Sequence, residues 1–135
     1  MRHDEFIGRV QDRAHLPSRG DAERATRATL ETLGERVPET TAEHLAAQLP
    51  IEIAENLRRT MTMGGAGTGE RFGLDEFAER VAQRGHMVVP DAVYRSRVVL
   101  EVVGEATQGA LGKVRDTLPG DLRELIDAGS TGSLH

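Results

Sequence analysis

A run of glycines in the middle of the chain is the first feature that could bind a ligand, because glycine-rich loops hold phosphate groups in many nucleotide-binding proteins. The stretch MTMGGAGTGERFG spans residues 61–73. A P-loop requires a lysine directly after its last glycine, but this chain has Glu70 after Gly69. A dinucleotide-binding loop requires a preceding strand, and no strand pattern precedes Met61. We therefore interpret residues 60–73 as a Gly-rich linker with no cofactor.

Two histidines, His15 and His86, end similar segments of the chain. Imidazole is a common zinc ligand, and two such rings could clamp a metal ion. No ligand spacing such as H-E-x-x-H occurs among the other histidines, His3, His44 and His135. The alternative is a polar cap, in which each ring and a nearby arginine, Arg13 or Arg84, pair with the last carbonyls of a helix. We favour the cap and predict no metal site.

A charged stripe could carry acid–base chemistry or form a docking face. Arg27, Glu31 and Glu35 share one side of an expected helix, opposite its apolar side. The pattern recurs at Arg97, Glu101 and Glu105. A pair of carboxylates can act in proton transfer, but charges at this spacing on a solvated helix usually stabilise that helix. We expect a solvated face with intrahelical pairs.

Signatures of enzyme chemistry are missing from the sequence. Without cysteine there is no thiolate nucleophile, disulfide or cysteine-type metal site. There is no G-x-S-x-G motif, no supported Ser/His/Asp order and no intrahelical Glu-x-x-His iron motif. The sequence therefore predicts no enzyme, and no catalytic, cofactor-binding or metal-ligating residue.

Composition is typical of a globular protein. Of 135 residues, 38% are apolar and 29% charged, with a net charge of -5. An acidic chain is not expected to bind nucleic acid, even with 16 arginines, although these could cluster locally. No apolar run could span a membrane, and Asp4 and Glu5 fall where a signal peptide needs its apolar core. We therefore expect a cytoplasmic protein. The preference for arginine over lysine, with abundant Ala and Gly, suggests a bacterial genome of high G+C content.

An internal repeat is the strongest pattern in the chain. Three blocks align in order: HDEFIGRVQDRAHL (3–16) with LDEFAERVAQRGHM (74–87), AERATRATLETLGE (22–35) with AVYRSRVVLEVVGE (92–105), and LAAQLPIEIAENL (45–57) with VRDTLPGDLRELI (114–126). The gaps fall only where turns are expected. We interpret the chain as a tandem duplication, with a first helical repeat at 1–59, a second at 74–128 and a flexible tail at 129–135.

The expected elements are all helical. Apolar residues recur at helical spacing, and no convincing stretch alternates with period two. Helix boundaries are predicted by two capping boxes, Ser18–Asp21 and Thr40–Glu43, and by three prolines, Pro38, Pro50 and Pro90. Because one repeat is too small to bury much surface, we predict an all-α helical bundle of about eight helices, with the two repeats related by a pseudo-twofold around one core.

Gly34 and Gly104 occupy matching places late in the second helix of each repeat. Either they permit a close contact between helices or they mark local fraying. The sequence leaves both explanations open.

The paired blocks DEFIGRV, LETLGERV and LAAQLPIEIAENL, and LDEFAERV, LEVVGEA and VRDTLPGDLRELI, resemble the bacterial family catalogued as domain of unknown function 2267. The resemblance extends from about Asp4 to Ile126. It implies a duplicated helical architecture and brings no activity or site residues.

The sequence thus predicts a non-catalytic protein-interaction or scaffold module, with an unknown protein partner or self-association. The alternative is a protein that binds a small ligand or nucleic acid.

Overall fold

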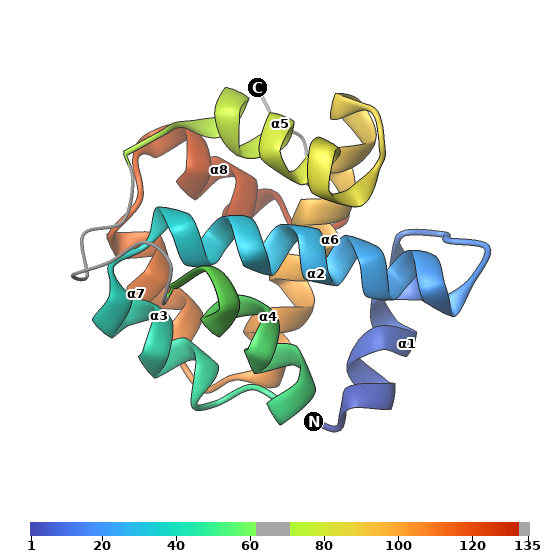
Figure 1. The fold of residues 1–135 in the computed structure, drawn as a ribbon, viewed down its shortest axis with the longest axis horizontal. Helices are drawn as coiled ribbons and strands as arrows, with labels where there is room; N and C mark the ends of the chain where they lie inside the picture. The colour runs from blue at the N-terminus through green and yellow to red at the C-terminus, as the bar shows by residue number, and fades with distance from the viewer. Residues whose placement is uncertain (62–70, 133–135) are drawn as a thin grey trace.

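The computed structural model describes residues 1–61 and 71–132, which we call the first half and the second half (Figure 1). Within these residues the chain forms eight helices and no strand: α1 (His3–Arg13), α2 (Arg19–Arg36), α3 (Glu39–Ala46), α4 (Ile51–Met61), α5 (Leu74–Gly85), α6 (Val89–Ala106), α7 (Ala110–Asp116) and α8 (Gly120–Ala128). The prediction of an all-α fold with about eight helices is confirmed.

The ends of the two long helices follow from local chemistry. Ser18 caps α2, because its hydroxyl accepts a 3.1 Å hydrogen bond from the backbone N–H of Asp21. The helix ends at Arg36, just before Pro38. Helix α6 carries Pro90 in its first turn, where a missing N–H costs nothing.

The capping box predicted at Thr40 and Glu43 is wrong. Helix α3 begins at Glu39, directly after Pro38, and has no side-chain cap. Thr40 is therefore the second residue of the helix, too late to be its N-cap, which is Pro38. Glu43 instead accepts two hydrogen bonds from Arg58 on α4, at 2.8 and 3.2 Å.

Helix α2 lies at the centre of the fold. In Figure 1 it runs horizontally across the molecule, with α5 above it and α3 and α4 below. It packs against α1, α4, α5 and α6, while α6 also packs against α1, α5 and α8, and α3 packs against α7. The first helix of each half therefore contacts the long helix of the other half.

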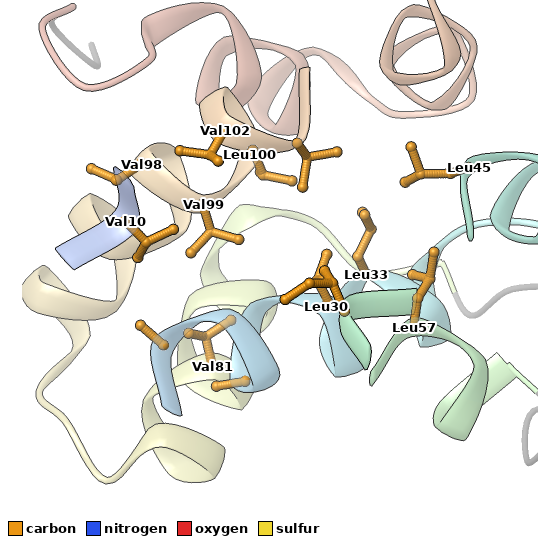
Figure 2. Close-up of a cluster of buried hydrophobic side chains, with 14 of the residues drawn as sticks. Val10, Leu30, Leu33, Leu45, Leu57, Val81, Val98, Val99, Leu100 and Val102 are labelled. Atoms are coloured by element: carbon orange, nitrogen blue, oxygen red, sulfur yellow. The ribbon is translucent and has the colours of Figure 1, made fainter. Parts of the chain in front are cut away.

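The buried apolar side chains form one cluster that draws on both halves. Figure 2 shows side chains from both halves in this cluster, among them Leu30, Leu33 and Leu57 of the first half and Val99 and Leu100 of the second. All five are 1% exposed or less. The core is thus shared between the halves. None of the described helices combines the length and apolar character needed to cross a membrane.

Residues 62–70 lie outside the described part of the chain, and most of the predicted linker, 60–73, falls there. Thr60 and Met61 belong to α4. Near the start of the second half, the ring of Phe72 lies under the guanidinium of Arg80, 4.0 Å from it. Residues 133–135 of the predicted tail also lie outside the described residues, whereas Gly129 and Ser130 are bonded to α6.

The two matched glycines have different surroundings. A Cβ atom at Gly34 would lie 2.5 Å from the carbonyl oxygen of Leu57 on α4. At Gly104 the nearest atom would be the Leu111 side chain, at 3.1 Å. Gly34 therefore permits a close approach of α2 to the backbone of α4, which answers the question that the sequence left open at this position.

Candidate functional site

Two groups of ion pairs join the halves of the chain. The first, which we call the Glu35 cluster, consists of Glu31 and Glu35 on α2 with Arg80 and Arg84 on α5. Arg84 lies 2.6 Å and Arg80 3.2 Å from the same oxygen of Glu35. Arg84 also donates to the hydroxyl of Thr32 at 2.9 Å. The Glu35 cluster therefore fastens the first helix of the second half to the long helix of the first half.

The Glu105 cluster consists of Arg9 and Arg13 on α1 with Glu101 and Glu105 on α6. Arg13 donates two hydrogen bonds to Glu105, at 2.5 and 2.8 Å, and Arg9 adds a third at 2.7 Å. A two-pronged arginine–carboxylate contact fixes orientation as well as distance. The sequence alignment of the halves pairs Arg13 with Arg84 and Glu105 with Glu35. The two clusters therefore use matching positions, but the first half supplies the carboxylates of one cluster and the arginines of the other.

In each cluster arginines lower the pKa of one carboxylate, Glu35 or Glu105. Burial alone would raise the pKa of Glu35, but the hydrogen bonds and charges of Arg84 and Arg80 outweigh it, and the pKa is lowered. The hydrogen bond from Arg13, joined by that from Arg9, lowers the pKa of Glu105. A general acid or base works best with a pKa near the working pH. Both carboxylates are therefore poorly suited to proton transfer at neutral pH.

The expectation of a solvated charged face on α2 is wrong. Glu31 is 7% exposed, and Arg59 on α4 approaches it to 2.5 Å. The physical reason is the central place of α2, which has neighbours on nearly every side. One expected intrahelical contact does occur, between Arg27 and Glu31, at the longer distance of 3.6 Å.

In the second half, the arginine of the predicted stripe has another role. Arg97 donates to the backbone carbonyls of Gly129, at 2.8 Å, and Gly132. Glu101 accepts a 2.9 Å hydrogen bond from the N–H of Ser130. These two side chains therefore hold the residues that follow α8.

His15 and His86 lie at the ends of α1 and α5, and both have left-handed backbones, with φ of 55° and 53°. His86 is the C-terminal cap residue of α5, and its N–H bonds to the carbonyl of Ala82. Among residues 1–61 and 71–132, no group of three or more His, Asp or Glu side chains is placed to hold a metal ion. The predicted polar cap is wrong in its partners: Arg13 and Arg84 donate to Glu105 and Glu35 and not to the last carbonyls of their helices. Within the described residues, the bonds of His15 and His86 at the helix ends are made by their backbone N–H groups.

Sequence reasoning identified the carboxylates of both clusters but missed their partners. Arg9 and Arg13 recur in the alignment as Arg80 and Arg84, one helical turn apart in each case. Because the arginine pair and the carboxylate pair both recur, the sequence contained a signal that the two pairs form salt bridges with each other. Their meeting across the halves depends on the packing of α5 against α2, which one sequence does not reveal.

Comparison with known families identifies one that covers most of the chain. The sequence profile of an uncharacterized conserved protein family, DUF2267, matches residues 3–125. A comparison with curated proteins finds no match. Since the matched range includes every helix up to most of α8, the chain belongs to the DUF2267 family.

Proposed function

We propose that this protein is a non-catalytic protein-interaction module of the bacterial cytoplasm, built by tandem duplication of one helical unit. In this proposal residues 74–128 repeat residues 1–59 about a pseudo-twofold, and the two repeats act as one domain. The partner is a protein, either a second copy of the chain or another molecule.

Three observations support the duplication. The long helices α2 and α6 both have 18 residues, and each follows a shorter helix that ends beside a left-handed histidine. The Glu35 and Glu105 clusters use aligned residues. Helix α1 packs on α6 as α5 packs on α2. A gene duplication predicts such matched contacts, whereas unrelated halves have no reason to share them.

Two exposed valines at the start of α6, Val88 and Val89, are the main support for an interaction surface. Val88 is 63% and Val89 42% exposed. Among the described residues the other large exposed apolar side chains are Met1 and Ile51, so only Val88 and Val89 are adjacent in sequence. Val88 also lines a shallow depression of about 360 Å³, together with Ala82, Gln83, His86 and Met87. Adjacent uncovered apolar groups gain free energy when a partner removes them from water.

The corresponding turn of the first half is polar. Residues 17–21 read PSRGD, where the second half has VVPD at 88–91. Both turns join a short helix to a long one. Because the polar turn makes the same connection, the fold does not require the two valines, and a role at the surface accounts for them better.

The charges support binding of protein over nucleic acid. The net charge is -5, and the arginines of both clusters are engaged with carboxylates of the same chain. Binding to the phosphate backbone of a nucleic acid requires lysine or arginine side chains that can exchange their carboxylate partners for phosphates. The same ion pairs hold Glu35 and Glu105 ionised, which supports a role without proton-transfer catalysis.

Photo-crosslinking tests the proposal. A benzoylphenylalanine placed at Val88 should give a specific crosslinked protein band in the native cell, and Val89→Asp should abolish that band. The same group at Ile51, which is 72% exposed on α4, is the control. Identical patterns from Val88 and Ile51, or a band that survives Val89→Asp, would refute the proposed surface. Sedimentation of the purified chain separates self-association from binding of another protein.

A further inference from the structure

An exposed side of α5 leads to Val88 and carries two acids, Asp75 and Glu79, which we call the α5 acids. Asp75, Glu79 and Gln83 are spaced four residues apart, so they share one side of the helix, and all three are exposed. Gln83 and Val88 line the same depression. At about 1.5 Å of rise per residue, Glu79 and Asp75 lie about 6 and 12 Å from Gln83 along the helix axis.

The α5 acids form no ion pair with any described residue. The neighbouring Glu76 is paired with Arg80, and Asp91, just after the valines, lies 4.0 Å from Arg95. Asp75 is in the first turn of α5, where the helix backbone favours a negative charge, but Glu79 lies beyond that turn. Within the described part of the fold, the charge of Glu79 therefore stabilises nothing that the structure shows.

Glu79 and the valines occur together in the second half only. The alignment of the halves places Gly8 opposite Glu79, and the first half has the polar turn PSRGD at 17–21 where the second has VVPD at 88–91. The duplicated fold requires neither feature, because the first half is built without them. A shared role at the surface accounts for their meeting at the same depression.

Charge decides which kind of partner suits this surface. The α5 acids would repel the phosphates of a nucleic acid or of an anionic membrane. A twofold dimer uses the same patch on both chains, so a dimer through the valines would bring two sets of α5 acids onto one interface. Lysine or arginine side chains of a different protein would be attracted instead.

We infer that the valines and the α5 acids bind a basic helical segment of another protein. An apolar side chain of the segment covers Val88 and Val89, and two basic side chains, four and eight residues further on, pair with Glu79 and Asp75 when the segment lies antiparallel to α5. The four-residue spacing is the same on both helices because both have the same rise per residue. This inference rests on the proposed function and names the chemistry of the partner.

Titration of the full-length protein with three synthetic peptides, followed by ¹⁵N–¹H NMR, tests the inference. All are alanine-rich helices of equal length. The basic peptide has one phenylalanine with arginines four and eight residues after it, the neutral peptide has glutamines instead of the arginines, and the third has alanine instead of the phenylalanine. The basic peptide should shift the amides of Glu79, Gln83, Val88 and Val89 saturably. The neutral peptide should bind about fivefold more weakly, as expected for two lost exposed ion pairs, and the third about tenfold more weakly.

Two variants and a matched control locate the binding. Asp75→Asn/Glu79→Gln should weaken the basic peptide about fivefold and leave the affinity for the neutral peptide unchanged. Glu52→Gln/Glu55→Gln removes two exposed acids from α4 and should bind both peptides as the unaltered protein does. Val89→Asp should weaken both peptides that carry phenylalanine. A well-dispersed spectrum confirms that each variant folds.

Three results would overturn the inference. Equal affinity for the basic and neutral peptides would show that the acids do not contribute, but would leave the proposed interaction surface standing. Absence of saturable shifts at Val88 and Val89 with the basic peptide would also overturn it, whereas the proposed surface itself fails only if the Val88 crosslink fails. Shifts of the same amides when the protein alone is concentrated would show that a second copy covers the surface instead.

Discussion

The guanidinium of Arg84 on α5 donates a 2.6 Å hydrogen bond to the carboxylate of Glu35 on α2, and so fastens the second half of the chain to the first. Arg13 on α1 reaches Glu105 on α6 over 2.5 Å and makes the matching connection in the other direction. Each half thus supplies arginines from its first helix and carboxylates from its long helix. Because the apolar core is shared as well, we expect the halves to unfold together.

Removing the charge of Glu35 should weaken the whole fold. Glu35→Gln should lower the free energy of unfolding by about 1–2 kcal/mol, because the pair is partly buried and Arg84 loses its anionic acceptor. Urea unfolding followed by circular dichroism measures this. Glu79→Gln is the control, since Glu79 is an exposed acid on α5. A loss in Glu79→Gln as large as that in Glu35→Gln would show that the cluster contributes nothing specific.

Acid should weaken the protein through the same carboxylates. Glu35 and Glu105 have lowered pKa values in the folded state, so they stay ionised at a pH where the unfolded chain binds protons. Their stabilisation is therefore complete above the unfolded glutamate pKa of about 4.3 and is lost as the pH falls through the lower folded values. Urea unfolding at a series of pH values should show this decline, and it should be shallower in the Glu35→Gln/Glu105→Gln variant. Equal slopes in both proteins would contradict the assignment.

The two matched glycines should respond differently to alanine. Gly34→Ala should destabilise the fold by about 1–3 kcal/mol, because the new Cβ would meet the backbone of Leu57. Gly104→Ala should change stability by less than about 1 kcal/mol, because the Leu111 side chain can move and alanine favours the helix. Thermal unfolding of both variants checks the difference. Equal effects would mean that α2 and α4 are not in close contact there.

The left-handed histidines should tolerate glycine. His86→Gly should raise the free energy of unfolding by about 0.5–1 kcal/mol, since glycine adopts a φ of 53° without strain. His44→Gly, inside α3, should lower it by a similar amount. Urea unfolding of the two variants measures both changes. If His86→Gly is destabilising, the imidazole itself makes a stabilising contact at the end of α5.

Much of the fold was predictable because its signals are local. Helical spacing gave the helices, and Ser18 and Pro38 marked the limits of α2. The Thr40–Glu43 capping box failed because α3 begins at Glu39, which places Thr40 inside the helix. Local patterns carry the least information where a residue's partner comes from a distant segment.

The candidate site shows this limit. Glu31 and Glu35 looked solvated because helical periodicity describes one apolar face, whereas α2 is enclosed by several helices. The buried, unpaired hydroxyl of Thr26 was not predicted either, because it is a property of the packing between helices. No spacing in a single sequence reports either feature.

Differential scanning calorimetry of the full-length chain tests most directly whether the halves form one unit. A single transition with equal calorimetric and van't Hoff enthalpies, shifted as a whole by Glu35→Gln, is the result we predict. Two transitions, of which Glu35→Gln moves only one, would contradict a shared core joined by the Glu35 and Glu105 clusters.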